Sequence, residues 1–327
     1  MLGSYINIIK NERRGILMYH IIINPASRSG KGLQIWKDQV EPMLHRENVA
    51  YRSYFSREAG DVAKIASEIS SAASAEDPTH VIILGGDGTV NEALQGISDP
   101  SRIIIGYIPT GSSNDFARDL QIPKDPSAAL DLILHSGKVQ RMDLGTVIYE
   151  DGKKRRFAVS CGIGFDAGVC EEALHSRMKV VLNKLGLGKL TYLGIALKQL
   201  ITSKKVSCRL TLDDQSPIEL NRFFFVACML HRFEGGGFMF CPDADSADGI
   251  IDLCTVGNIP KPLVLLALPT AFKGKHYMFK GVTPYKAKNI KIETSAPLWV
   301  HTDGEVTRRT NCFTVTCSQQ ALQIISA

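Results

Sequence analysis

The sequence of 327 residues has no apolar run long enough to cross a membrane as a helix. Its longest apolar runs lie at 223–230 and 263–268, far short of the roughly 20 residues that a bilayer requires. All eight cysteines come after residue 160 and none forms a C-x-x-C pair, so we expect reduced, buried thiols rather than a metal site. Lys10, Arg13 and Arg14 interrupt a weakly apolar N-terminus, which is the wrong order for a signal peptide. A cytoplasmic protein is therefore expected, with membrane contact that is at most peripheral.

Disordered, collagen-like and coiled-coil compositions are also excluded, because apolar residues make up 44% of the chain and charged residues 22%. The length suggests two domains. The net charge of +5 conceals an asymmetry: residues 1–140 hold 14 Lys and Arg against 16 Asp and Glu, whereas residues 141–327 hold 24 against 17. No nucleic-acid recognition motif accompanies the basic half, so nucleic acid is not an expected partner.

The first half alternates short, uniformly apolar segments with helical patterns, which favours a parallel sheet with helices on both faces. Beyond about residue 144, strands follow one another with fewer helices, which favours an antiparallel sandwich or barrel. The expected strands are 18–23, 51–55, 81–84, 103–108, 157–160, 207–212, 218–229, 250–256, 290–294 and 312–316, and the expected helices are 31–46, 60–75 and 90–96.

The most informative motif is Gly85-Gly86-Asp87-Gly88-Thr89, between the strand 81–84 and a helix. Glycines let backbone N–H groups approach an anion, the helix N-terminus adds partial positive charge, and Thr89 adds a hydroxyl. Asp87 would repel a phosphate unless a cation lies between them, and a Mg²⁺-nucleotide supplies that cation. The alternative is a tight turn in which Asp87 caps the helix.

Two further loops follow neighbouring apolar strands, NPASRSG at residues 24–30 and PTGSSNDFAR at 109–118. Either alone is ordinary turn chemistry. Because ligands bind outside the carboxyl ends of parallel strands, the three loops together predict a phosphate site. The chain has neither G-x-x-x-x-G-K-[ST] nor G-x-G-x-x-G, so this site is of another kind.

In this order, NPASRSG, GGDGTVNE and PTGSSNDFAR closely resemble the diacylglycerol kinase catalytic domain of bacterial lipid kinases, relatives of sphingosine and ceramide kinases. GGDGT also occurs in NAD kinases and, in related form, in phosphofructokinases, so the later motifs favour the lipid branch. The resemblance covers residues 18–327. Those later motifs are Gly235-Gly236-Gly237, Pro242-Asp243-Ala244, Asp248-Gly249 and Asp303-Gly304-Glu305.

The resemblance implies a three-layer, Rossmann-like α/β nucleotide domain of the NAD kinase and phosphofructokinase kind, at 18–143 with the chain's end (about 310–327) returning to it. A β-sandwich-type lipid-binding domain at 144–309 would follow, and residues 1–17 would be an extension. Asp87 and either Glu305 or Asp303, as proton acceptor, would be catalytic. A structural Mg²⁺ would bind Asp248 and the main-chain oxygens of Asp245 and Ile250. ATP would contact Asn24, Pro25, Ala26, Ser27, Arg28, Ser56, Gly86, Asp87, Gly88, Thr89, Val90, Asn91, Glu92, Ser112, Asn114 and Asp115.

Three departures from the family pattern stand out. The first loop is NPASRSG rather than NPxSG, Ser112 replaces the usual Thr, and Ala247 stands where a second Asp is common. The last difference leaves room for a lipid other than diacylglycerol. The expected function is ATP- and Mg²⁺-dependent conversion of diacylglycerol to phosphatidic acid. Alternatives are a sphingoid, monoacylglycerol or prenol kinase, a NAD kinase-like enzyme, or a non-catalytic nucleotide-binding membrane adaptor.

Apart from the resemblance, the spacing of Asp303 and Glu305 puts both carboxylates on the same side of the backbone if the segment is extended. Gly304 between them would allow close approach of a substrate. The alternative is a plain hairpin turn at Asp303-Gly304. Asp143 closes the first expected domain and either reaches the expected interdomain cleft or caps a turn.

Two basic stretches contain no acidic residue, one between Ala173 and Leu212 with eight Lys or Arg and the other between Leu253 and Ile292 with seven. Leucines in the first stretch indicate an amphipathic helix, or a pair broken near Gly186 and Gly188. Such segments suit an anionic membrane surface, whereas a solvated charged face is the alternative. We expect a membrane lipid as substrate and peripheral association with the inner face of the membrane, and a homodimer is compatible with these features.

Overall fold

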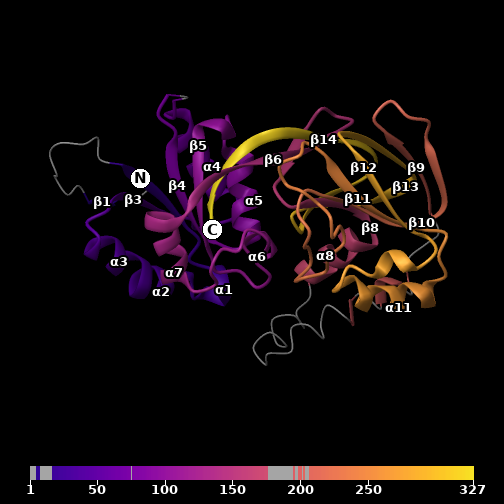
Figure 1. The fold of residues 1–327 in the computed structure, drawn as a ribbon, viewed down its shortest axis with the longest axis horizontal. Coiled ribbons are helices and arrows are strands. Elements are labelled where there is room, and N and C mark those ends of the chain that lie inside the picture. Colours follow the sequence, from indigo (N-terminus) through magenta and orange to yellow (C-terminus); the bar gives the residue numbers. More distant parts are fainter. Residues whose placement is uncertain are drawn as a thin grey trace. The chain divides into compact units, whose positions relative to one another are not determined.

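The computed structural model describes residues 5–7, 17–74, 76–175, 194–195, 198–200, 202 and 206–327. The chain forms two compact units (Figure 1). Unit 1 comprises Met1–Asp143 and Gln320–Ala327, and unit 2 comprises Leu144–Gln319. The sequence places the return of the chain to its first domain at about residue 310, whereas unit 1 resumes at Gln320.

Unit 1 is built on a parallel sheet. Its neighbouring strands are β3 (Ala50–Phe55), β2 (Met18–Ile23), β4 (Thr79–Gly85) and β5 (Ile103–Pro109), with β1 (Tyr5–Asn7) antiparallel beside β3. The last residues of β14 (Glu305–Ser326) pair in parallel with β5, so the chain's end completes this sheet. Most positions of the central strands are buried, because helices cover both faces.

The helices of unit 1 form two groups. In one group, α4 (Asp61–Ser71) packs on α5 (Asp87–Gly96). The two helices are so close at Gly96 that a Cβ there would overlap the carbonyl oxygen of Ala63. In the other group, α7 contacts β5 and the helical stretch that follows β2. This second group comprises α2 (Gly32–Ile35), a π-helical segment (Trp36–Val40), α3 (Glu41–Arg46), α7 (Pro126–Asp131) and the π-helical segment Leu132–Ser136. The predicted α/β class is confirmed.

Unit 2 is built mainly from antiparallel strand pairs. Its sandwich core contains Ile163, Val226, Leu253, Ile292 and Val315. β6 and β14 continue from one unit into the other. The strands are β6 (Lys138–Tyr149), β7 (Lys154–Phe157), β8 (Ser160–Gly164), β9 (Val206–Leu212), β10 (Ile218–Met229), β11 (Ile251–Gly257), β12 (Val282–Ala287), β13 (Asn289–Thr302) and the first part of β14.

The outward face of β10 and β11 forms a second apolar layer with two helices, α8 (Phe165–His175) and α11 (Lys261–Ala271). Phe225 and Val256 supply the strand side of this layer, and Phe165 and Val264 the helix side. Both helices lie along one side of the strands (Figure 1). The predicted β-sandwich-type class of the second half is thereby confirmed.

Several predicted bounds are wrong in this half. The expected strand 157–160 is a break, because β7 ends at Phe157 and β8 begins at Ser160. The expected strand 290–294 is only the first part of the longer β13, because a register shift between Glu293 and Leu298 interrupts the alternation of β13. The expected strand 312–316 is the middle of the much longer β14. The predicted amphipathic helix or pair lies largely outside the described residues.

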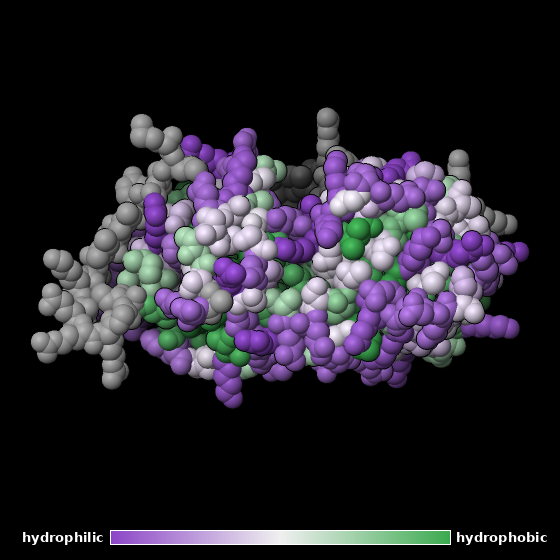
Figure 2. Space-filling model, turned by 90° about the horizontal axis from the view of Figure 1, so that it is seen from above, coloured by the Kyte–Doolittle hydropathy of each residue, from purple (hydrophilic) through white to green (hydrophobic). Residues whose placement is uncertain are grey.

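No described helix has the length and apolar character needed to cross a membrane. The face seen in Figure 2 is mainly hydrophilic and neutral, with hydrophobic side chains in smaller groups between them.

Candidate functional site

The three predicted loops of unit 1 meet at the carboxyl edge of its parallel sheet. The backbone N–H of Asn24, after β2, donates to Leu84 O of β4 at 3.0 Å, and its Nδ2 donates to Thr89 Oγ1 at 3.0 Å. Thr110, after β5, donates through its backbone N–H to Gly85 O at 2.7 Å and through Oγ1 to Ser27 Oγ at 2.8 Å. Each loop is thus tied to the other two.

The first loop has an unusual backbone. Arg28, Ser29 and Gly30 all have positive φ angles (52°, 58° and 91°), so α1 (Ser27–Gly30) is a left-handed turn rather than a regular helix. Asn24 Oδ1 accepts the N–H of Ala26 at 3.1 Å and fixes the start of this turn. Arg28 is exposed at its tip.

Glycines bring the second and third loops into direct contact. A Cβ at Gly86 would lie 3.0 Å from the Cα of Gly111, and a Cβ at Gly111 would lie 2.7 Å from the Cα of Gly86. Any side chain here would separate the two loops. Asn114, at φ 50°, accepts the N–H of Gly111 through Oδ1 at 2.9 Å and holds the third loop closed.

Asp87 is the first residue of α5 and is held by two groups from the neighbouring strand and loop. Tyr107 Oη donates to its Oδ1 at 3.2 Å, and the N–H of Asp115 donates to its Oδ2 at 3.0 Å. The helix N-cap is Gly86, and no side-chain cap bond is made there, so the capping alternative for Asp87 is wrong. Burial, together with the charges of Asp87 and Asp115, raises the pKa of Tyr107 far above its usual range, so its hydroxyl stays protonated and donates.

The Asp115 carboxylate is also oriented. It is nearly buried at the start of α6 (Asp115–Asp119) and accepts a hydrogen bond from Arg118 Nη1 at 2.9 Å. Asp87 and Asp115 therefore face the same loop junction, with each carboxylate fixed by a donor. Sequence reasoning found both carboxylates but missed Tyr107, whose only sequence signal is a phenol within an apolar strand.

Other predicted ATP contacts have different surroundings. Glu92 Oε1 accepts the N–H groups of Gly60 and Val62 at 2.7 and 3.1 Å, at the start of α4. Ser56 continues the β2–β3 ladder by donating its N–H to Ile23 O at 3.0 Å. Val90 and Asn91 are buried in α5, whereas Ser112 is exposed.

Asp143 is fully buried and accepts the N–H of Gln320 through Oδ1 at 2.8 Å. Both residues belong to unit 1, so this bond ties the returning end of the chain to the end of the first segment.

In unit 2, Asp303 and Gly304 form the two-residue turn between β13 and β14, both with positive φ (50° and 81°). The predicted extended arrangement is wrong, and the hairpin alternative is right. Asp303 Oδ1 accepts the N–H groups of Val159 and Ser160 at 2.8 and 3.0 Å, and Oδ2 accepts that of Ala158 at 3.0 Å. Three backbone amides thus engage both oxygens of this carboxylate. Glu305 follows as the first, partly buried residue of β14.

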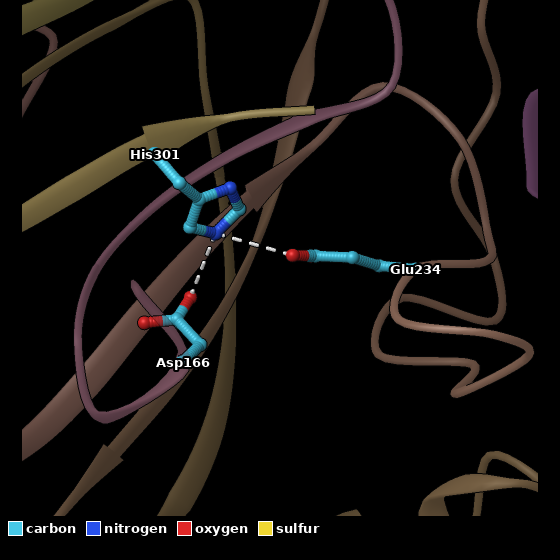
Figure 3. Close-up of side chains that lie close together, drawn as sticks. All are labelled: Asp166, Glu234 and His301. Atoms are coloured by element: carbon cyan, nitrogen blue, oxygen red, sulfur yellow. Dashed lines mark hydrogen bonds and ion pairs between the residues drawn. The ribbon is translucent and has the colours of Figure 1, made fainter. Parts of the chain in front are cut away.

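A buried cluster supports this turn: His301 from β13, Asp166 from α8 and Glu234 from the loop before Gly235-Gly236-Gly237 (Figure 3). His301 Nε2 lies 3.2 Å from Asp166 Oδ2 and 3.1 Å from Glu234 Oε1. On the other side of the ring, Nδ1 accepts the N–H of Gly304 at 3.2 Å. The ring therefore joins the two carboxylates to the turn.

Glycine makes this cluster possible. Gly162 pairs with His301 across β8 and β13, and a Cβ there would overlap Asp166 Oδ2 and lie 2.5 Å from His301 Nε2. Sequence reasoning missed all three side chains of the cluster. The available signal was their position beside glycine motifs, since Asp166 follows Gly162 and Gly164, and Glu234 precedes three glycines.

Two effects act on the His301 ring in opposite directions. Burial lowers the pKa of His301, but the charges of Glu234 and Asp166 outweigh it and raise the pKa to about 9. The Gly304 contact, in contrast, fits a neutral ring with a free lone pair on Nδ1. The contacts in the structure are those of the neutral ring, with its proton on Nε2 between the two carboxylates and the Nδ1 lone pair toward Gly304. A second proton, which the two carboxylates favour, would bind Nδ1 and break the hydrogen bond with Gly304.

The cluster also has the composition of a metal centre, because its three potential ligand atoms lie within 4.8 Å of one another. A histidine that binds metal through Nε2 normally keeps its proton on Nδ1 and donates it. Here Nδ1 faces the N–H of Gly304 and accepts. The cluster is better explained as support for the turn than as a metal centre.

The predicted Mg²⁺ ligands lie in the loop before β11. Asp248 Oδ1 accepts the N–H of Ile250 at 2.9 Å, and Asp245 Oδ1 accepts that of Ala247 at 3.0 Å. Burial raises the pKa of Asp252, and the charges of Asp248 and Asp243 add to this, partly offset by Lys286. Oxygen donors and concentrated negative charge fit a hard cation.

Comparisons with known proteins agree on one family. Residues 18–147 match the diacylglycerol kinase catalytic domain, and residues 159–326 match the YegS C-terminal NAD kinase beta sandwich-like domain. A Bacillus subtilis protein named "Putative lipid kinase YtlR" is 32% identical over 94% of this chain and 98% of its own. A Mycobacterium tuberculosis protein named diacylglycerol kinase is 30% identical over 87% of each chain. A Bacillus anthracis crystal structure, titled as that of "a putative diacylglycerol kinase", superposes with a TM-score of 0.72 at 25% identity, over 96% of this chain and 99% of the other.

Proposed function

Since the chain belongs to the diacylglycerol kinase catalytic-domain family of lipid kinases, we propose that it transfers the γ-phosphoryl group of ATP to the hydroxyl of diacylglycerol, forming phosphatidic acid. Mg²⁺ is the proposed metal, and the cytoplasmic face of a membrane is the proposed source of the lipid. The observation that supports this most directly is the junction of three loops at the carboxyl edge of the unit 1 sheet, with Asp87 held in their midst.

The phosphates of ATP would bind at this junction. The contact between Gly86 and Gly111 exposes backbone rather than side chains, and the N-terminus of α5 adds its partial positive charge. The tie between Asn24 and Thr89 orients their polar groups, and Arg28 offers a cation at the tip of the first loop. Positioning by such groups is the main protein contribution to phosphoryl transfer.

The metal that accompanies ATP would bind near Asp87, with Asp115 as the second carboxylate, and it would neutralise charge that develops on the phosphoryl group. Tyr107 and the N–H of Asp115 hold the Asp87 carboxylate, and Arg118 holds that of Asp115. Fixed carboxylates need no reorientation when the nucleotide binds. A second, structural Mg²⁺ in unit 2 would use Asp248 and the main-chain oxygens of Asp245 and Ile250.

Glu305 is the proposed proton acceptor for the lipid hydroxyl. Asp303 is the alternative, but three backbone amides already engage both of its oxygens, so accepting a substrate proton there would disrupt these hydrogen bonds. Asp303 would instead hold the turn from which Glu305 projects. His301, supported by Asp166 and Glu234, would position the same turn through Gly304.

The test offers radiolabelled ATP and Mg²⁺ with diacylglycerol, monoacylglycerol, a sphingoid base and a prenol in anionic vesicles, and with NAD in solution. Transfer to diacylglycerol above all other acceptors is expected. Preference for another lipid alcohol would correct the substrate, transfer to NAD alone would refute the lipid assignment, and ATP binding without any transfer would favour an adaptor. Asp87→Asn is the matched inactive control.

A further inference from the structure

Exposed hydrophobic side chains are concentrated in one short segment of unit 2. Of the eight large hydrophobic residues exposed in the described part of the chain, five lie between residues 263 and 278. Leu266 is 61% exposed and Met278 is 75% exposed. Single exposed hydrophobic residues are ordinary, but five within one helix and the turn after it form a patch that needs a partner. The patch consists of Leu263, Leu265, Leu266, Phe272 and Met278.

The helix that holds most of this patch is apolar on both sides. Val264, Ala267 and Ala271 of α11 are buried, with Val264 and Ala271 in the layer on the outward face of β10 and β11. Leu263 and Leu266 lie on exposed positions of the same helix. A helix that is hydrophobic all round is normally buried in an interior or in lipid. Half of α11 therefore lacks the apolar surroundings that its composition fits.

The patch is preformed rather than loosely attached. Phe272 stacks on Phe238 with ring centroids 4.1 Å apart, and Phe238 stacks in turn on Phe240 at 5.6 Å. The turn His276–Met278 packs against α11, and His276 Nε2 lies 3.0 Å from Phe240 O. The exposed side chains thus sit on a rigid base, so little ordering entropy opposes their contact with a partner.

The charge around the patch indicates the chemistry of that partner. From Leu253 to Ile292 the chain has no acidic residue, and Lys273, Lys275 and Lys280 are exposed beside the patch. A second copy of the chain would bring these lysines against one another, whereas an anionic lipid surface satisfies both the lysines and the leucines. The other lysines of this stretch are Lys261, Lys286, Lys288 and Lys291.

A short series of contacts connects the patch to the Asp303–Glu305 turn. Phe238 exchanges two backbone hydrogen bonds of 2.9 Å with Glu234, and Glu234 contacts His301, which accepts the N–H of Gly304. The unit that would bind the acceptor lipid is therefore also the unit that presents the apolar patch.

We propose that α11 and the turn His276–Met278 form the membrane-docking surface. Leu263, Leu266, Phe272 and Met278 enter the interfacial region of an anionic bilayer, and the neighbouring lysines contact lipid phosphates. The proposal rests on the proposed function, because it assumes an acceptor taken from a membrane. It goes beyond that function by naming the element that docks.

The experiment compares two triple variants in sedimentation with vesicles of equal parts phosphatidylglycerol and phosphatidylcholine. The patch variant is Leu263→Gln, Leu266→Gln, Met278→Gln. The control is Leu17→Gln, Leu33→Gln, Val139→Gln, which changes the other three exposed hydrophobic residues of the described chain. We expect the control to bind like the unchanged protein and the patch variant to lose at least about ten-fold in partition coefficient. Unchanged thermal unfolding shows that both variants fold.

A second variant tests the electrostatic part of the proposal. Replacing Lys273, Lys275 and Lys280 by Gln should reduce binding to the anionic vesicles about 100-fold, while leaving weak binding to pure phosphatidylcholine vesicles unchanged. Equal losses with both kinds of vesicle would contradict the role of these lysines.

Two results would overturn the docking surface. One is vesicle binding by the patch variant as strong as that of the control. The other is self-association of the unchanged protein in sedimentation velocity that the patch variant abolishes without losing vesicle binding, since the patch would then join two copies. Transfer to a short-chain diacylglycerol in free solution tests the proposed function separately: its absence refutes that function, whereas the vesicle data judge α11 alone.

Discussion

Replacing Asp303 separates a structural role from a catalytic one. Its two carboxylate oxygens accept three backbone N–H groups from residues 158–160, at 2.8 to 3.0 Å. Asp303→Ala removes both acceptor oxygens, so all three N–H groups lose their partner at once. In Asp303→Asn, the side-chain oxygen can take the place of Oδ1 and still accept the N–H groups of Val159 and Ser160. The new NH₂ group then faces the N–H of Ala158, which loses its acceptor.

The magnitude follows from these bonds. A hydrogen bond to a charged group contributes about 1.5–3 kcal/mol, and a buried donor left without an acceptor costs about 1–3 kcal/mol. Because the three amides are consecutive and the hairpin can relax, the losses do not add fully. We expect Asp303→Ala to lower the free energy of unfolding by about 3–5 kcal/mol and Asp303→Asn by about 1–2 kcal/mol.

The assay pairs urea unfolding with ATP-dependent transfer to lipid, and Glu305→Gln is the matched comparison. Glu305→Gln should reduce turnover about 100- to 10,000-fold with little change in unfolding, as for loss of a general base. Asp303→Asn should retain measurable turnover in proportion to the folded fraction. An Asp303→Asn protein as stable as the original but inactive would refute the assignment, because Asp303 would then be the base.

Three further predictions follow from the same contacts. Asp87→Asn should abolish transfer, by at least about 1,000-fold, and circular dichroism should show the fold unchanged; full activity would reduce Asp87 to a structural residue. Gly162→Ala should lower the free energy of unfolding by about 2–3 kcal/mol, since its Cβ would overlap Asp166 and lie 2.5 Å from His301 Nε2. An unchanged midpoint of urea unfolding would contradict this packing. The carboxylates raise the pKa of His301 from 6.5 to about 9, so the stabilisation from its proton is complete below about pH 6.5 and is lost as the pH rises through about 9. The free energy of unfolding of the original protein and of His301→Gln, measured across this pH range, gives the loss. A difference between the two proteins that does not change with pH would contradict the prediction.

The fold of unit 1 was largely predictable because its signals are local. Each central strand is a short apolar run, since helices cover both faces of a parallel sheet, and each run ends in a loop of Gly, Ser, Thr or Asn. The position of Asp87 between a strand and a helix follows from the same local pattern. The local pattern does not reveal which residues contact Asp87, because its hydrogen-bond donor Tyr107 lies 20 residues away, in the next strand.

Unit 2 was less predictable, since its geometry depends on contacts between distant residues. Asp166 and His301 are 135 positions apart, and both are needed before either has a recognisable role. Gly162 allows them to meet, but a glycine in a strand has many explanations. The long β13 was shortened in the prediction, because a register shift breaks the alternation on which strand recognition depends.

Asp303-Gly304-Glu305 shows how residues can suggest a candidate site through a geometry that they do not adopt. Two carboxylates at a spacing of two lie on one side only if the backbone is extended, but Asp-Gly is also the commonest signal of a two-residue hairpin turn. The turn prevails because both residues adopt positive φ and three amides some 143–145 positions earlier engage the first carboxylate. Those amides leave no sequence signal. The turn therefore gives the two carboxylates different surroundings, and this difference is the physical ground for assigning the stabilising role to Asp303 and the proton to Glu305.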